Sequence, residues 1–217
     1  MDWNRRRAKE RGLPTFFWHK AWADNVKKIV EIAWSKWIKY LTLWAMSKEN
    51  LIKRDKDEIE KIISLIDKIE DFLWEMMEKW LRFKTIWDIE KLPERSVKIL
   101  KWLEEKTKNN NWIVLTIALV YSWQDEIIRA TKKAINSWIN PENLTYEEFK
   151  KFLDTSFLPN PDLIIRTWWD IRHSWFLLFD SEYSQYYFSD KKWPDFDQEE
   201  LEKALFSLNN AKRNFWK

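Results

Sequence analysis

The stretch that decides the fold is PDLIIRTWWDIRHSWFLL, residues 161–178. Its first part, Asp162–Thr167, is largely apolar and contains β-branched residues, which predicts a buried strand. Arg166 stands at the end of that strand, a turn follows, and we expect a helix to begin close to Arg172 and Ser174. Two guanidinium groups and a hydroxyl at one strand end are donors suited to a diphosphate. The stretch therefore predicts an anion site at the end of a buried strand.

Outward from this stretch, short apolar runs alternate with longer amphipathic ones. The expected strands are Ile38–Met46, Leu81–Ile86, Ile113–Tyr121, Asp162–Thr167 and Tyr186–Phe188. The expected helices are residues 20–36, 55–79, 92–108, 124–137, 146–154 and 197–214. Several strands are apolar on both faces, as in parallel sheets covered by helices. The alternation predicts βαβ units in a single α/β domain over residues 1–217, with a mostly parallel central sheet flanked by helices.

The composition excludes some classes of function but identifies none. The chain has 217 residues, enough for one domain with a substantial core. Lys and Arg number 38 and Asp and Glu 35, so the formal charge of +3 does not argue for a nucleic-acid partner. The absence of cysteine excludes disulfides and thiolate chemistry and fits a reducing compartment. No signal peptide is visible, and no apolar run reaches the ~18 residues of a spanning helix.

The glycine and tryptophan contents are abnormal, with 1 Gly and 18 Trp. A chain of this length would ordinarily hold roughly 15 Gly, and turns need glycine where φ is positive. Several Trp stand in turn-like contexts, among them Trp87 and Trp138. We interpret most of the Trp as Gly in the natural protein, whose gene would come from a lineage that reads UGA as glycine. The alternative is a Trp-rich protein of the lipid interface, although the Trp form no stripe at helical or strand spacing.

Four motifs resemble those of the cis-prenyltransferases. Residues 166–174 are similar to the family signature Arg-Thr-(Ser/Gly)-Gly-Glu-x-Arg-x-Ser, with Trp at family glycines. MDWNRRRAK, residues 1–9, is similar to Met-Asp-Gly-Asn-Gly-Arg-Trp-Ala-Lys. FWHKAW at 17–22 is similar to Phe-Gly-His-Lys-Ala-Gly, and AMSKEN at 45–50 to Ala-Phe-Ser-x-Glu-Asn. The resemblance covers the whole chain, in the order and at the spacing of the family.

The resemblance implies an enzyme of the undecaprenyl diphosphate synthase type, which elongates an allylic diphosphate such as farnesyl diphosphate with isopentenyl diphosphate. It implies the fold of that family, with an apolar tunnel that we expect Leu41, Leu43 and the apolar face of residues 59–73 to line. It also implies a homodimer, with the two diphosphates as small-molecule partners and no nucleic acid. The expected location is cytoplasmic, with peripheral contact to the membrane that receives a lipid product.

The resemblance also implies roles for particular residues. The catalytic residues would be Asp2 and Asn50, and the cofactor Mg²⁺ would be held by Asp2 and Gln185. The remaining substrate-binding residues follow from the matched motifs: Asn4, Arg6 and His19 for the allylic diphosphate, Ser47 near the reacting carbons, and Arg166, Arg172 and Ser174 for isopentenyl diphosphate.

The chain also departs from the family pattern. Gln185 and Gln124 replace a Glu and an Arg, and Thr15 stands where an Arg often follows Pro. An amide oxygen can ligate Mg²⁺ but brings no charge, which would lower the metal affinity. A second hypothesis is therefore a non-catalytic prenyltransferase-like subunit that binds a partner or lipid. The family has a strand just before its first motif, so we also expect the natural chain to begin upstream of Met1, with a first strand that this sequence lacks.

Overall fold

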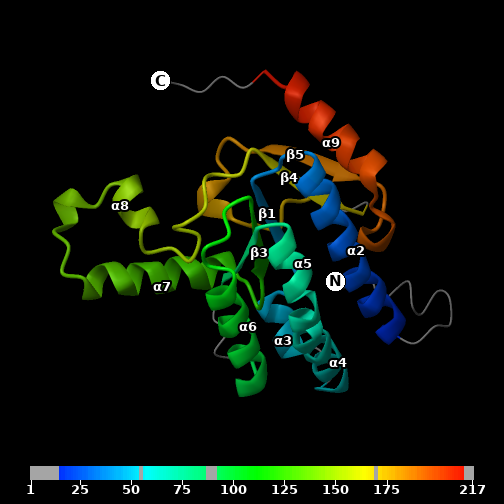
Figure 1. Ribbon diagram of the computed structural model, residues 1–217. Helices are drawn as coiled ribbons and strands as arrows, with labels where there is room; N and C mark the ends of the chain where they lie inside the picture. The colour runs from blue at the N-terminus through cyan, green and yellow to red at the C-terminus, as the bar shows by residue number, and fades with distance from the viewer. Residues whose placement is uncertain (1–14, 54–55, 87–91, 169–170, 213–217) are drawn as a thin grey trace.

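The computed structural model describes residues 15–53, 56–86, 92–168 and 171–212, in which helices and strands alternate (Figure 1). The helices are α2 (Thr15–Ser35), α3 (Lys48–Lys53), α4 (Lys56–Asp67), α5 (Leu73–Glu78), α6 (Glu94–Lys106), α7 (Trp123–Asn136), α8 (Tyr146–Lys150) and α9 (Gln198–Asn210). The strands are β1 (Tyr40–Trp44), β2 (Leu81–Ile86), β3 (Ile113–Ala118), β4 (Leu163–Thr167) and β5 (Gln185–Ser189). The 3-10 helices are η1 (Lys68–Phe72), η3 (Pro141–Asn143), η4 (Leu178–Asp180) and η5 (Trp193–Asp195).

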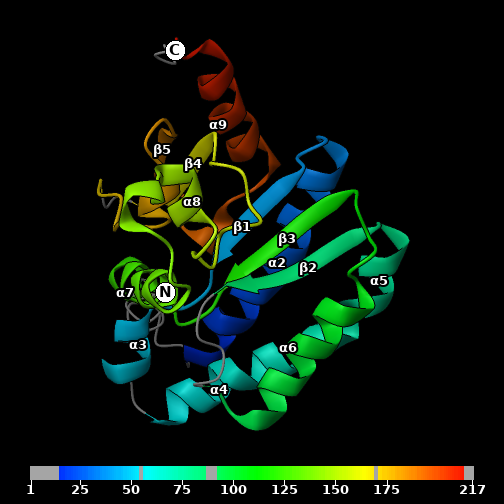
Figure 2. The ribbon, with the colours of Figure 1, turned by 90° about the vertical axis from the view of Figure 1, so that its left-hand side faces the viewer.

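The strands pair in parallel, and each lies where the sequence predicts one. The described residues form two sheets, one with the order β1-β3-β2 and one in which β4 pairs with β5. Every residue of β3 is buried, which explains why that strand is apolar on both faces. Figure 2 shows β1, β3 and β2 side by side, with α2 behind them.

Contacts from α2 hold the segment after β5 against the three-stranded sheet. The side chain of Asn25 donates a 3.0 Å hydrogen bond to the carbonyl of Phe196, and the indole N–H of Trp193 donates one of 3.1 Å to the carbonyl of Trp22. Phe196 also belongs to a small core cluster with Leu41 and Ile165 packed around it. The two sheets therefore share apolar contacts although no strand pairing joins them in the described part of the chain.

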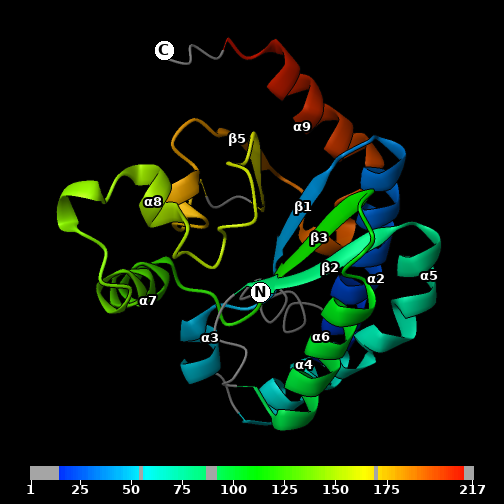
Figure 3. The same cartoon turned by 60° about the vertical axis from the view of Figure 1, so that its left-hand side comes forward.

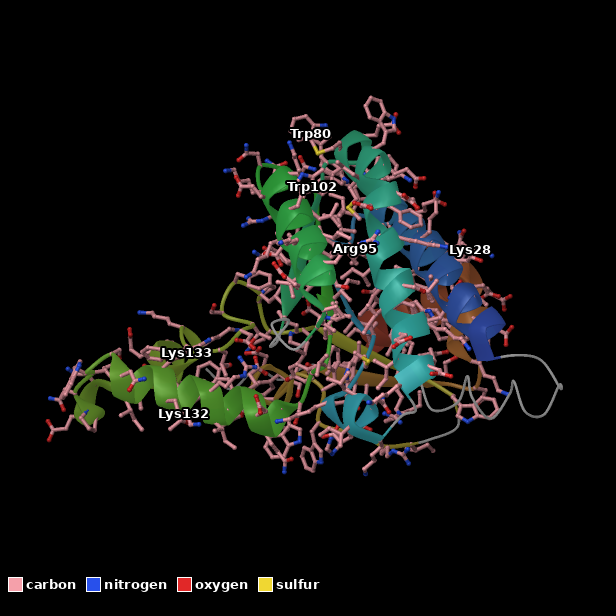
Figure 4. All side chains as sticks on the ribbon, turned by 90° about the horizontal axis from the view of Figure 1, so that it is seen from below. Lys28, Trp80, Arg95, Trp102, Lys132 and Lys133 are labelled. Carbon is pink, nitrogen blue, oxygen red and sulfur yellow. The ribbon has the colours of Figure 1, made fainter. Side chains whose placement is uncertain are left out.

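Three helical segments lie side by side when the molecule is seen from below: α2, the α4–α5 segment, and α6 (Figure 4). In α6, Val97, Leu100 and Leu103 are buried at helical spacing, and most of the charged residues of that helix are exposed on the other side. On the opposite flank, α7 and α8 extend away from the sheet (Figures 1 and 3). The arrangement confirms the predicted α/β class, with parallel strands flanked by helices.

The predicted single helix over 55–79 is wrong in one respect. A 3-10 turn, η1, separates α4 from α5. Side chains three residues apart point the same way in a 3-10 helix, so Ile69 and Phe72 both reach the cavity described below. The helical segment changes from an α-helix to a 3-10 helix at η1, and its apolar side chains still face the same cavity.

The backbone supports the interpretation of the tryptophans. Among the described residues other than glycine, eight have φ between 50° and 78°, and five of them are tryptophans, listed here: Trp37, Trp80, Trp138, Trp168 and Trp175. A bulky side chain in this left-handed region is an outlier, because its Cβ approaches the carbonyl oxygen. Glycine has no Cβ and adopts the region freely. The natural identity of these positions stays a prediction.

Candidate active site

The candidate site lies where β1 and β3 end together. Trp44 pairs with Ala118 at the last position of the two strands, and a further bridge joins Ser47 to Tyr121 just beyond them. The amide of Tyr121 donates a 3.0 Å hydrogen bond to the carbonyl of Met46. Ligands of open α/β sheets bind outside the carboxyl ends of the strands, so these segments are placed to meet a substrate.

Ser47 fixes the start of the short helix α3. Its hydroxyl accepts a 3.2 Å hydrogen bond from the amide of Asn50, and its carbonyl accepts one of 3.3 Å from the amide of Leu51. This is N-cap geometry, which satisfies amide groups that have no partner within the helix. The structure therefore brings the predicted pair Ser47 and Asn50 together at the end of β1.

Arg166 and Ser174 also lie together. Nη1 of Arg166 donates a 2.8 Å hydrogen bond to the hydroxyl of Ser174. Arg166 is the penultimate residue of β4 and is only partly buried, whereas Arg172 is exposed. Of the two guanidinium groups and the hydroxyl expected at this strand end, the structure brings Arg166 and Ser174 together, and Arg172 lies exposed in the same loop.

The segment around Ser174 is a turn, so the expectation that a helix begins near Arg172 and Ser174 is wrong. Ser174, Trp175 and Leu177 have φ of 50°, 60° and 52°. Three left-handed residues within four positions cannot continue a right-handed helix. The turn is held instead by burial of Leu177 and by aromatic contacts of Phe176.

An aromatic cluster of Trp44, Tyr121 and Phe176 fastens this turn to the strand ends. The rings of Trp44 and Phe176 stack with their centroids 5.1 Å apart, and Tyr121 meets Phe176 edge-on at 5.5 Å and Trp44 at 6.0 Å. Such pairs add to the burial of apolar surface. The cluster connects the segment that carries Ser47 with the turn that carries Ser174.

Tyr121 also contacts a buried acid. Its hydroxyl donates a 2.7 Å hydrogen bond to Oε2 of Glu126, which is 4 % exposed, and accepts one from the amide of Leu177. Burial raises the pKa of Glu126 to about 7, against the opposing effect of the bond from Tyr121. Burial and the neighbouring carboxylate raise the pKa of Tyr121. Glu126 was not singled out from the sequence, because an acidic residue in an amphipathic helix is ordinarily exposed.

A second network surrounds the start of α7. Nζ of Lys48 lies 2.5 Å from Oδ1 of Asp125, and Arg129 bonds to Asp125 at 2.8 Å and to both oxygens of Asp154. Burial alone would raise the pKa of Asp125, but the hydrogen bonds from Lys48 and Arg129 hold it below its usual value. Lys48, next to Ser47, is thereby tied to α7.

An apolar cavity, partly open to solvent, reaches Ala45 and Leu119 just beyond the strand ends and extends between the three-stranded sheet and its helices. Its walls are mostly apolar, with these residues: Trp22, Val26 and Val30 from α2, Ile62, Leu65, Ile69 and Phe72 from the α4–η1 segment, and Ala45, Leu81, Phe83, Leu115, Ile117 and Leu119 from the sheet region. The predicted apolar tunnel and its lining by the 59–73 face are confirmed. Leu41 and Leu43, also expected to line it, pack with the core clusters.

The remaining predicted residues are Asp2, Asn4, Arg6, His19 and Gln185. Asp2, Asn4 and Arg6 lie outside the described residues, and His19 lies in the first half of α2. Gln185 begins β5 opposite Leu163, three register positions from the pair of Arg166 and Phe188. Three strand residues span about 10 Å, so Gln185 and Arg166 are apart along the sheet.

The described residues do not by themselves fit a divalent cation. Within residues 15–53, 56–86, 92–168 and 171–212, no group of three or more His, Asp or Glu side chains is arranged to hold a metal. Gln185 offers a single neutral oxygen. The expected Mg²⁺ site therefore depends on Asp2, and no chemical step below is assigned to the metal. Over the same ranges, no helix is both long and apolar enough to cross a membrane.

Comparison with known proteins agrees with this geometry. The sequence matches the family of undecaprenyl diphosphate synthases over residues 1–216. An isoprenyl transferase of Clostridium perfringens is 39 % identical, over 99 % of this chain and 87 % of its own length. A farnesyl-diphosphate-specific ditrans,polycis-undecaprenyl-diphosphate synthase of Micrococcus luteus is 36 % identical, over 99 % of this chain and 88 % of its own.

A solved structure matches as well. Lavandulyl diphosphate synthase from Lavandula x intermedia, crystallised with dimethylallyl diphosphate, superposes with a TM-score of 0.88 at 28 % identity, over 97 % of this chain and 93 % of that one. The resemblance of the four motifs is thus confirmed over the full length, and the chain belongs to the undecaprenyl diphosphate synthase family of prenyltransferases.

Proposed function

We propose that the chain elongates an allylic diphosphate by cis-condensation with isopentenyl diphosphate and releases a polyprenyl diphosphate. The observation that carries this proposal is the apolar cavity that reaches Ala45 and Leu119, just beyond β1 and β3. Ser47 and Asn50 follow Ala45 closely, and the aromatic cluster fastens the turn that carries Ser174, the partner of Arg166, to the same strand ends. A hydrocarbon chain needs an apolar space, and a diphosphate needs cationic and hydroxyl donors at its mouth. The relatives named above make farnesyl diphosphate the first primer to supply.

The proposed reaction breaks the bond between C1 of the allylic substrate and its diphosphate, which leaves with the electron pair. The double bond of isopentenyl diphosphate then forms a carbon–carbon bond to C1, and a proton is lost to give the new double bond. Arg166, Arg172 and Ser174 would hold the diphosphate of isopentenyl diphosphate. This placement would orient its double bond toward the allylic carbon.

The remaining assignments follow the matched motifs. Asn4, Arg6 and His19 would hold the allylic diphosphate, and Ser47 and Asn50 would lie near the reacting carbons. Asp2 would carry Mg²⁺, with Gln185 as a weaker second ligand; a bound cation supplies charge that stabilises a leaving diphosphate. We also propose a homodimer that meets the membrane peripherally, because the product is a lipid.

A variant of Arg166 tests the proposal. Arg166→Met keeps the apolar stem and removes the charge, and a hydrogen bond to a charged group contributes about 1.5–3 kcal/mol, so the KM for isopentenyl diphosphate should rise about 10- to 100-fold. The control is Arg95→Met, since Arg95 is exposed on α6 and is not among the residues of the candidate site (Figure 4). An unchanged KM in Arg166→Met would exclude the assigned role. Binding of prenyl diphosphates by a folded chain without turnover would favour the non-catalytic subunit.

A further inference from the structure

The cavity runs from the candidate site to the opposite edge of the sheet. Ala45 follows the last residue of β1, and Leu119 follows the last residue of β3, whereas Leu81 is the first residue of β2. Leu81 pairs with Ile113, six residues before Leu119, so the cavity spans about 20 Å along the strands. A chain that grows at the strand ends would therefore extend toward Leu81 and the start of β2.

The deep part of the cavity has charged side chains in its wall. Lys27 and Glu31 from α2 line it, together with Glu75 from α5 and Lys79, the residue after α5 has ended. They form two ion pairs across the space between α2 and α5. Nζ of Lys27 is paired with Oε1 of Glu75, and Nζ of Lys79 lies 3.3 Å from Oε1 of Glu31.

The two pairs are spaced regularly. Lys27 and Glu31 are four residues apart on α2, and Glu75 and Lys79 are four residues apart along the facing segment, so the second pair lies about 6 Å deeper than the first. Lys79 precedes the first residue of β2 by two positions, so the pair of Lys79 and Glu31 lies near the start of that strand, at the end of the cavity away from the candidate site. Lys27 also lies over the ring of Phe72, 5.4 Å from its centroid, which connects the first pair to the apolar lining.

These side chains are in contact with water as well as with the cavity. The side-chain exposures are 41 % and 36 % for Lys27 and Glu75, and 25 % and 49 % for Lys79 and Glu31. Ion pairs this exposed contribute little to stability. Their position matters more, because a hydrocarbon that passes between them must strip water from charged groups, which opposes the gain from burying further apolar surface.

We infer that the pairs Lys27–Glu75 and Glu31–Lys79 form a polar stop that sets the length of the polyprenyl product. The inference rests on the proposed chain elongation and names the residues that would limit it. A chain that reaches the stop would leave the enzyme, since the next unit would have to displace water from one of the pairs. Apolar replacements at the same positions would let the chain continue between α2 and α5.

The test uses double variants of the whole chain with farnesyl diphosphate and labelled isopentenyl diphosphate. Glu31→Leu with Lys79→Met makes the deeper pair apolar, and Lys27→Met with Glu75→Leu does the same for the first. Glu31→Lys with Lys79→Glu exchanges the charges and keeps an ion pair. Product length is read by reversed-phase chromatography after removal of the diphosphate, and the rate of the first addition is measured separately.

A matched control is the ion pair of Lys36, the residue after α2, and Glu202 of α9, which are 2.6 Å apart and are not among the residues that line the cavity. Lys36→Met with Glu202→Leu removes the same two kinds of charged group outside the cavity. A single control, Lys28→Met, alters the exposed neighbour of Lys27 (Figure 4). Both controls should leave the product length unchanged.

The expected result is a main product longer by one or more isoprene units in the apolar variants, with the first addition changed by less than about twofold and with no change in length in the charge-exchanged variant. Unchanged length in both apolar variants, or the same lengthening in the Lys36 and Glu202 control, overturns the polar stop. A folded unmodified chain that makes no product overturns the proposed elongation and the stop with it, so the two failures are distinguishable.

Discussion

Arg166 donates a 2.8 Å hydrogen bond to the hydroxyl of Ser174 across a turn that separates them by eight residues. The arginine comes from the end of a strand, and the serine from a left-handed position of the turn. The bond directs the guanidinium toward the turn, where the exposed Arg172 also lies. This relationship underlies the assignment of isopentenyl diphosphate to this side of the site.

Replacement of the serine tests that assignment. Ser174→Ala removes the acceptor for Arg166 and a donor for the substrate, so the KM for isopentenyl diphosphate should rise about tenfold with a smaller change in kcat. Ser174→Thr should recover part of the loss. The control is Ser35→Ala, which removes an exposed hydroxyl at the end of α2. Equal kinetics for Ser174→Ala and Ser35→Ala would show that Ser174 does not contact substrate.

The buried pair of Tyr121 and Glu126 predicts a dependence of stability on pH. Burial raises the pKa of Glu126 from 4.5 to about 7, so the folded state holds this proton more tightly than the unfolded state. The stabilising contribution is fully present below pH 4.5 and is lost as pH rises through about 7. It should amount to at most about 3 kcal/mol in the free energy of unfolding.

Urea unfolding at pH 5 and pH 8 measures this contribution. In Glu126→Gln the difference in the free energy of unfolding between the two pH values should shrink by up to about 3 kcal/mol, because the amide does not titrate. Glu202→Gln, which alters an exposed carboxylate on α9, should keep the difference of the unmodified chain. The same pH dependence in Glu126→Gln would mean that another group carries it.

We predict that substitution of Trp138 by glycine stabilises the protein. It follows the end of α7 with a φ of 57° and is 90 % exposed, so its side chain contributes little burial while its backbone is in the left-handed region. Trp138→Gly should raise the free energy of unfolding by about 1 kcal/mol. Trp102→Gly, within α6, should lower it by about the same amount or more.

Circular dichroism during urea unfolding compares the two variants without relying on tryptophan fluorescence. Opposite signs would support the interpretation that Trp138 is a glycine in the natural protein, and peptide mass spectrometry of that protein would identify the residue directly. Loss of stability in both variants would contradict the steric argument for Trp138.

The neutral amide of Gln185 should give a low affinity for Mg²⁺, and we expect the substitution Gln185→Glu to raise it. Gln185→Glu supplies the charge that the amide lacks, so the Mg²⁺ concentration for half-maximal activity should fall severalfold. Gln198→Glu adds the same charge at an exposed position at the start of α9 and should have no effect. An unchanged Mg²⁺ titration for Gln185→Glu would remove Gln185 from the metal site.

The sequence predicts those elements whose signal is contained in a short stretch of residues. The strand over Leu81–Ile86 is found with the predicted bounds, and Ile113–Ala118 is buried on both faces, as its apolar run implies. Thr145 accepts a 3.3 Å hydrogen bond from the amide of Glu148, three residues further on, so the start of α8 is also capped from within its own short stretch. In these places, the short-range pattern and the tertiary structure agree.

The features that the sequence did not predict depend on contacts between segments that are distant in the sequence. The helical periodicity runs without interruption through 55–79, so the 3-10 turn at Lys68–Phe72 has no local signal and follows from packing around the cavity. The turn after Arg172 is held by Phe176 against Trp44, which lies far away in the sequence. Glu126 was missed for the same reason, because an acidic residue in an amphipathic helix is ordinarily exposed.

Chain elongation itself is tested most directly by incubation with farnesyl diphosphate, radiolabelled isopentenyl diphosphate and Mg²⁺, followed by chromatography of the products. The account predicts labelled polyprenyl diphosphates several isoprene units longer than the primer, with their formation dependent on Arg166. A folded chain that binds isopentenyl diphosphate but incorporates no label would contradict the account, and the non-catalytic subunit would take its place.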